Sequence, residues 1–147
     1  MSNFKDQKIT VFGFARSGVA AAEKLLSAGA KVLVTESAEE EKFAAGSIDV
    51  LRQRGVDFEF GGHSDRILES DMIVVSPGVQ LDIPVITRAK AIGIPVISEI
   101  ELAYNFLSRP IIAITGTNGK TTTASLIGEI LKNGGKKVAV AGNIGYP

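Results

Sequence analysis

The chain has 147 residues, 45% of them hydrophobic and 22% charged, and its formal net charge at pH 7 is zero. This apolar content is enough for a packed core, and the balanced charge gives no general attraction to nucleic acid or to an anionic membrane. The absence of cysteine excludes disulfides and thiolate chemistry, and without a signal-peptide-like or membrane-length apolar run we expect a soluble, cytoplasmic protein.

Short apolar runs alternate with helix-like stretches through the first two-thirds of the chain. The run Ile9-Thr10-Val11-Phe12, which stops at a glycine, is typical of a buried parallel strand. By the same criteria we predict strands at residues 9–12, 32–34, 58–60, 73–75 and 95–97, and helices at about 17–28, 39–55, 83–92 and 98–107. Alternating strands and helices indicate an α/β fold, a Rossmann-like parallel sheet covered on both faces.

Ser108-Arg109-Pro110 is the best candidate for a linker between two domains. We predict a Rossmann-like domain at residues 1–108 and the start of a second domain at 109–147, with strands at 111–114 and 138–140 around a helix at 120–133. Only 38 residues run from Pro110 to the end. Since domains below roughly 40 residues usually need outside support, we expect the second domain to be truncated.

The strongest motif is Gly116-Thr117-Asn118-Gly119-Lys120-Thr121-Thr122, which lies between a predicted strand and a predicted helix. Glycines let the backbone bend around a phosphate, and the amide groups of a helix N-terminus point at the anion. Lys120 would reach the β- and γ-phosphates of ATP, and the Thr121 hydroxyl would ligate Mg²⁺. The spacing is a shortened form of the common phosphate loop, and the alternative is an ordinary glycine-rich turn.

A second glycine-rich segment, Gly13-Phe14-Ala15-Arg16-Ser17-Gly18, follows the first predicted strand. It differs from a dinucleotide fingerprint because its middle glycine is Ala15, while Glu36 lies 18 residues beyond Gly18, near the place of a ribose-binding acid. Three interpretations stay open: a nicotinamide or flavin site, a site for another nucleoside diphosphate, or close helix–strand packing. Arg16 is a candidate phosphate contact.

Ser76-Pro77-Gly78 predicts a tight turn at the carboxyl edge of the same sheet, where ligands bind in open α/β folds. Taken alone it is as compatible with a plain turn as with a site. Three other residues are not assigned a role: His63, the only histidine, is predicted to be a solvated loop residue, and Glu99 and Glu101 to be exposed charges at a helix start.

Together, the two glycine-rich loops, the Ser-Pro-Gly turn, Ile100-Glu101-Leu102 and the downstream Gly142-Asn143-Ile144-Gly145 resemble the start of a Mur ligase over the whole chain. The Ser-Pro-Gly turn favours the branch of this family that adds D-glutamate to UDP-N-acetylmuramoyl-L-alanine in peptidoglycan precursor synthesis. The alternatives are a Rossmann-type NAD-binding module, a sister ligase for another amino acid, or another phosphate-loop enzyme such as a small kinase.

The resemblance implies that the first domain binds the UDP part of the substrate. It places Arg16 and Ser17 at the diphosphate, and the segment Thr35-Glu36-Ser37, which differs from the family's Asp-Thr-Arg-like stretch, near the uracil and ribose. Ser76, Pro77 and Gly78 would complete that pocket, and Asn143 would lie near the peptide end of the substrate.

The implied reaction uses ATP and Mg²⁺ to convert the substrate carboxylate to an acyl phosphate, which the amine of D-glutamate then attacks. Lys120 is the implied catalytic residue. The resemblance also implies a monomeric full-length protein without nucleic-acid or membrane partners, in which most of the catalytic machinery lies beyond this chain.

Overall fold

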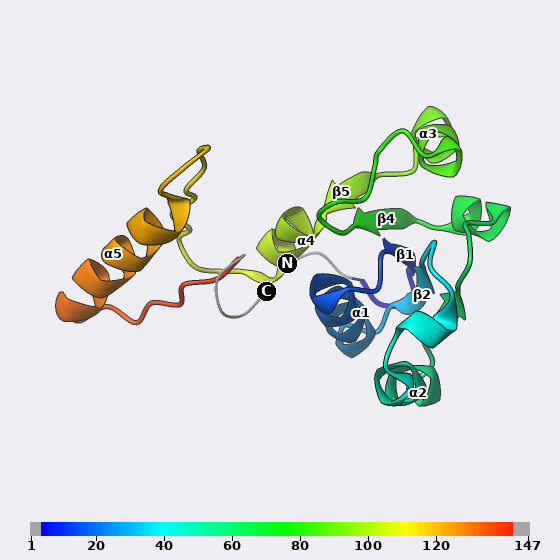
Figure 1. The fold of residues 1–147 in the computed structure, drawn as a ribbon, viewed down its shortest axis with the longest axis horizontal. Helices are drawn as coiled ribbons and strands as arrows, with labels where there is room; N and C mark the ends of the chain where they lie inside the picture. The colour runs from blue at the N-terminus through cyan, green and yellow to red at the C-terminus, as the bar shows by residue number, and fades with distance from the viewer. Residues whose placement is uncertain (1–3, 143–147) are drawn as a thin grey trace. The chain divides into compact units, whose positions relative to one another are not determined.

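The computed structural model in Figure 1 describes residues 4–142. The chain divides into two compact units, Met1–Leu107 and Ser108–Pro147. Among the described residues, no helix is both long and apolar enough to cross a membrane.

Five parallel strands form the sheet of the first unit, in the order β3-β2-β1-β4-β5. The strands are β1 (Lys8–Phe12), β2 (Lys31–Thr35), β3 (Asp57–Glu59), β4 (Met72–Val75) and β5 (Val96–Ser98). Phe12, the last residue of β1, is in register with Thr35 of β2 and Val75 of β4. The predicted α/β fold with a parallel sheet is therefore confirmed.

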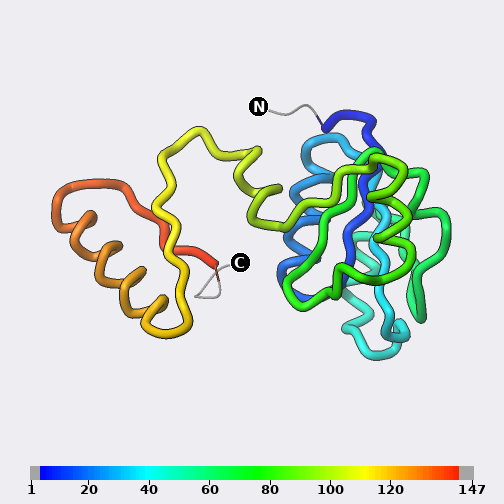
Figure 2. Tube along the Cα trace, turned by 90° about the horizontal axis from the view of Figure 1, so that it is seen from above, coloured from blue at the N-terminus to red at the C-terminus, as the bar shows by residue number. Residues whose placement is uncertain are grey.

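Helices cover both faces of this sheet because successive side chains of a buried strand point to opposite sides. Val11 and Val34 pack in one cluster with residues of α1 (Arg16–Ser27), α2 (Ala45–Gln53) and α4 (Glu99–Phe106). Phe12 and Val75 pack in a second cluster with α3 (Pro84–Ala91) and the 3₁₀ turn η2 (Asp65–Glu69). Figures 1 and 2 show α1 and α3 on opposite sides of the sheet.

The helix predicted at residues 39–55 is divided in the structure. A 3₁₀ turn, η1 (Glu40–Lys42), ends at Phe43, whose extended backbone separates it from α2. The Phe43 ring packs edge-on against Phe14, with 5.4 Å between ring centroids. Burial of this aromatic side chain competes with the helical preference of the acidic residues before it.

In the second unit, α5 (Lys120–Asn133) has the predicted bounds, but the two predicted strands at residues 111–114 and 138–140 are wrong. Neither segment forms a strand, and no backbone hydrogen bond from either is found among the described residues. A strand requires a hydrogen-bonded neighbour, which residues 108–142 do not supply. Val140 packs instead against Gly128 of α5.

Candidate functional site

The order of the strands places a topological switch point between β1 and β4. The chain leaving β1 enters α1 on one face, and the chain leaving β4 leads to α3 on the other. Ligands of open parallel sheets bind where two such connections diverge, outside the carboxyl ends of the strands. Two of the predicted segments, the loop after β1 and the Ser-Pro-Gly turn after β4, meet at this point.

Close packing joins these two segments. A Cβ at Gly13 would lie 3.0 Å from the Cβ of Ser76, and a Cβ at Gly18 would lie 2.1 Å from the carbonyl oxygen of Gly13. Neither position has room for a side chain. The first and last glycines of the loop therefore bring α1, β1 and the β4 turn into contact, as the packing interpretation of the loop requires.

Ser76-Pro77-Gly78 forms the predicted tight turn, closed by a 3.1 Å hydrogen bond from the Val79 amide to the Ser76 carbonyl. Proline at the second position and glycine with φ of 92° at the third match a type II turn. The Ser76 residue is only 6% exposed, and its Oγ has no hydrogen-bond partner among the described residues. A buried hydroxyl without a hydrogen-bond partner is uncommon in a folded protein.

The N-terminus of α1 faces this turn with no side-chain cap. Its capping residue, Ala15, has no side-chain acceptor, and no acidic residue lies in the first turn. Arg16 is exposed and Ser17 half-buried, so both predicted diphosphate contacts lie on the first turn of the helix. The N-terminus of α4 differs, because Ser98 and Glu101 form a capping box there. The charge pattern of α1 therefore suits an anion.

Thr35 and Glu36, at the end of β2, are already engaged by the protein. Thr35 is fully buried, and its Oγ1 lies 2.7 Å from His63 Nδ1 and 3.2 Å from both Glu59 Oε2 and the Gly62 carbonyl. The Glu36 carboxylate accepts hydrogen bonds from the Phe14 and Ala38 amides at 3.0 Å each, and one from the exposed Ser37 hydroxyl at 3.1 Å.

The carboxylate of Glu36 thus ties the loop after β1 to the loop after β2. Partial burial raises the pKa of Glu36, but the hydrogen bonds from the Ala38 and Phe14 amides and from Ser37 outweigh it and hold the pKa below its usual value of 4.5. Glu36 is consequently ionised at neutral pH. Oε1 accepts two of these hydrogen bonds and Oε2 accepts one, so each carboxylate oxygen already has a partner in the protein.

Two residues without an assigned role in the sequence prove to be partly buried at the same edge. His63, predicted to be solvated, packs its ring on Phe12 with 4.8 Å between centroids and hydrogen-bonds Thr35. Glu99, predicted to be exposed, has a buried Oε1 that lacks a partner among the described residues. The two glycines before His63 are the only local signal that the chain turns back over the sheet there. The sequence around Glu99 contains no signal of burial.

In the second unit, the phosphate-loop motif forms a loop that ends at the start of α5. Gly119 caps the helix in a left-handed conformation, with φ of 76°, which favours glycine. No side chain caps the helix, and no acidic residue lies in its first turn. The Lys120 ammonium folds back and donates to the carbonyl oxygens of Gly116 and Thr117.

The remaining loop positions, Thr117, Asn118, Thr121 and Thr122, are exposed. The predicted Mg²⁺ contact, Thr121, is therefore an exposed residue at the start of α5. No group of three or more histidine or acidic residues that could hold a metal by itself exists among residues 4–142. Asn143 lies outside the described residues.

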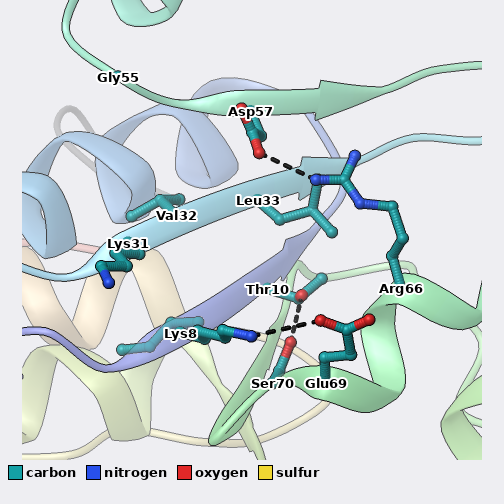
Figure 3. Close-up of a pocket in the computed structure, with 11 residues that line it drawn as sticks. Lys8, Thr10, Lys31, Val32, Leu33, Gly55, Asp57, Arg66, Glu69 and Ser70 are labelled. Carbon is teal, nitrogen blue, oxygen red and sulfur yellow. Dashed lines mark hydrogen bonds and ion pairs between the residues drawn. The ribbon is translucent and has the colours of Figure 1, made fainter.

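A hollow of about 300 Å³ lies at the opposite edge of the sheet, at the amino ends of β1, β2 and β3 (Figure 3). Two cations that line it are paired with carboxylates: Lys8 with Glu69 at 3.3 Å and Arg66 with Asp57 at 2.9 Å. None of the residues that line this hollow belongs to the loops after β1, β2 or β4, so the hollow is separate from the candidate nucleotide site.

Comparison with protein families assigns both units. Residues 7–98 match the family described as Mur ligase MurD-like, N-terminal domain, and residues 114–146 match the Mur ligase middle domain.

Among curated relatives, UDP-N-acetylmuramoylalanine–D-glutamate ligases from Koribacter versatilis and Geotalea daltonii are 47% and 51% identical to this chain over 144 residues. Each alignment covers 97% of this chain and 32% of the relative, so the chain spans about a third of the length of these relatives.

Solved structures share the fold. A pseudomurein peptide ligase type C from Methanothermus fervidus is 27% identical, with a TM-score of 0.59 over 88% of this chain and 27% of its own. UDP-N-acetylmuramate-alanine ligase from Thermotoga maritima is 29% identical, with a TM-score of 0.58 over 86% of this chain and 29% of its own.

Proposed function

Because this chain belongs to the Mur ligase family, we propose that it supplies the UDP-substrate site and the start of the ATP site of a ligase that joins D-glutamate to UDP-N-acetylmuramoyl-L-alanine. The observation that carries the proposal is the identity of 47–51%, over nearly the whole chain, to relatives named for that reaction. The proposed domains are residues 1–108 and 109–147. The reaction consumes ATP, so we place it in the cytoplasm.

In the first unit, the uncapped N-terminus of α1 and the side chains of Arg16 and Ser17 would bind the diphosphate. The buried, unpartnered Ser76 hydroxyl supports a ligand at the same point, since a hydrogen bond to the substrate would satisfy it. Pro77 and Gly78 would shape the wall of the pocket. The segment Thr35-Glu36-Ser37 would contribute to uridine binding mainly by holding the surrounding loops in place. Thr35 is buried, and both Glu36 oxygens accept hydrogen bonds from backbone amides.

In the second unit, the phosphate loop would bind ATP, the amides of Gly116 to Thr122 surrounding the phosphates. On ATP binding, Lys120 would exchange the carbonyls of Gly116 and Thr117 for phosphate oxygens. Thr121 would help to hold Mg²⁺, which neutralises phosphate charge.

The proposed reaction has two steps. The substrate carboxylate attacks the γ-phosphorus and ADP leaves, which gives an acyl phosphate. The D-glutamate amine then attacks the acyl carbon, loses a proton and expels inorganic phosphate as the amide bond forms. Lys120 would stabilise the charge on the transferred phosphoryl group.

The main alternative is a nicotinamide-binding module, and Glu36 argues against it. In dinucleotide-binding folds the acidic residue at the end of the second strand accepts a hydrogen bond from the ribose. Here both carboxylate oxygens already accept hydrogen bonds from the protein, and Ala15 replaces the glycine that would let a pyrophosphate approach the backbone.

Thermal unfolding with UDP-N-acetylmuramoyl-L-alanine and with NADH separates the two functions. A ligand present at one hundred times its Kd stabilises the folded state by about 2.7 kcal/mol, which corresponds to a midpoint increase on the order of 10 °C for a unit of this size. We expect such an increase with the UDP compound alone. An increase with NADH alone would refute the proposal. In the full-length protein, Lys120→Ala should abolish ADP formation, and an unchanged rate would refute the role of Lys120.

A further inference from the structure

His63 lies over the carboxyl ends of β1 and β2, beside both loops of the proposed nucleotide site. Its ring covers Phe12, the residue before Gly13, and its Nδ1 contacts Thr35, the residue before Glu36. The side chain is neither exposed nor fully buried. It is therefore placed at the nucleoside end of the switch point, on the β2 side, where dinucleotide folds hold the ribose and base.

The glycines before His63 direct the chain back over the sheet. Gly61 and Gly62 have φ of 73° and 157°, and a Cβ at Gly61 would lie 2.8 Å from an oxygen of Glu39. Their amides donate to the carbonyls of Ala38 and Glu36, at 3.1 and 3.3 Å. Since these bonds anchor the loop to the end of β2, the position of His63 is built into the backbone.

The contacts of Thr35 select one tautomer of His63. A threonine hydroxyl has one proton, and three candidate acceptors surround it: His63 Nδ1, Glu59 Oε2 and the Gly62 carbonyl. If Nδ1 carries a proton, it donates to Thr35, and Thr35 donates to Glu59 or Gly62, so two hydrogen bonds form. If Nδ1 carries no proton, the Thr35 hydroxyl donates its one proton to Nδ1, and only this one hydrogen bond forms. The first arrangement satisfies more groups.

In that tautomer Nε2 has a lone pair, and no residue that the structure describes hydrogen-bonds to it. Burial lowers the pKa of His63, and the nearby carboxylates of Glu59 and Glu36 only partly oppose this. The ring is thus neutral at neutral pH, with Nε2 an acceptor.

We propose that His63 is a nucleoside-binding residue whose Nε2 accepts a hydrogen bond from an N–H or O–H group of the base or ribose, while Thr35 orients the ring through Nδ1. This inference rests on the proposed function, because it assigns a further contact within the UDP site. It adds a residue for which the sequence indicated only a solvated loop.

Two amide variants separate the roles of the two ring nitrogens. In His63→Asn, the amide reaches the position of Nδ1 but not that of Nε2, so the link to Thr35 is kept and the ligand contact is lost. In His63→Gln, the longer side chain brings the amide to the position of Nε2. Affinities for UDP, 2′-deoxy-UDP and pyrophosphate are measured by isothermal titration calorimetry on the 147-residue chain.

We expect His63→Asn to weaken UDP binding roughly 2- to 10-fold, the range of one neutral hydrogen bond, and His63→Gln to restore most of the affinity. Pyrophosphate binding should be unchanged in both variants, because it lacks the nucleoside. If the 2′-hydroxyl is the donor, 2′-deoxy-UDP should bind equally well to wild type and His63→Asn; if another donor is used, its affinity should fall as that of UDP does.

Unchanged UDP affinity in His63→Asn, or equal losses for UDP and pyrophosphate, would overturn the inference while leaving the proposed function intact. Absence of UDP binding by the wild-type chain would overturn both. As a second measurement, the ring of the only histidine gives a single set of NMR signals. Its Nε2 resonance should shift when UDP is added, and a resonance that stays fixed at saturation would contradict the contact.

Discussion

Replacing Gly18 by alanine would introduce a methyl group into the contact between α1 and the loop after β1. The added Cβ would lie 2.1 Å from the Gly13 carbonyl oxygen, about 1.3 Å closer than an ordinary van der Waals contact of 3.4 Å. The opposing atom belongs to the backbone, so α1 must move away from the sheet. Overpacking of this kind costs about 1–3 kcal/mol, and the severe overlap places Gly18 at the upper end of this range.

Alanine also has a higher helix propensity than glycine, by about 0.5–1 kcal/mol, so the net loss should be roughly 2 kcal/mol. Gly46 of α2 offers a matched control, because a Cβ there would meet no atom within 4 Å. Gly46→Ala should therefore stabilise the protein by the propensity gain alone.

Thermal unfolding followed by circular dichroism measures both variants. For a unit of about 100 residues, 1 kcal/mol corresponds to roughly 4–8 °C in Tm. We expect Gly18→Ala to unfold roughly 8–16 °C below wild type and Gly46→Ala a few degrees above it. A Gly18→Ala variant as stable as wild type, or equal losses in both variants, would refute the packing described for this loop.

Three further predictions concern the ends of the strands. Ser98→Ala removes the capping box of α4, in which Ser98 Oγ accepts from the Glu101 amide, and should lower the free energy of unfolding by about 1 kcal/mol in urea titrations. Ser76→Ala removes a buried hydroxyl without a partner, so Tm should be unchanged or higher while calorimetry shows weaker UDP binding; a lower Tm with unchanged affinity would contradict this. For His63, burial lowers the pKa of the folded state, so the unfolded chain takes up the proton first as the pH falls below about 6.5. Stability should therefore decrease from pH 7 to pH 5, and His63→Gln should flatten this part of a series of urea midpoints.

The sheet of the first unit was predictable because its central strands are buried on both faces. β1, β2 and β4 appear in the sequence as apolar runs that end at a turn or polar residue. The bounds of α5 were also predictable from the sequence, since glycines flank both ends of the helix. The two loops at the switch point could be located for the same reason: each follows one of these strands.

Contacts between distant segments account for what the sequence did not predict. Phe43 leaves a helical stretch to pack on Phe14, and His63 reaches Phe12 and Thr35 across 51 and 28 positions of the chain. The sequence placed Glu36 at the end of the second strand. It did not indicate that both carboxylate oxygens accept hydrogen bonds from backbone amides, because those amides belong to loops that come together only in the folded chain.

The two outer strands of the sheet, β3 and β5, have three residues each. An unpaired strand edge can template the addition of a strand from another molecule, and short, charged edges oppose this. Two of the three residues of β3 are acidic, Asp57 and Glu59, and β5 passes directly into α4. The first unit should therefore resist edge-to-edge aggregation at high concentration, which makes it suited to calorimetric and NMR titrations of the proposed nucleotide site.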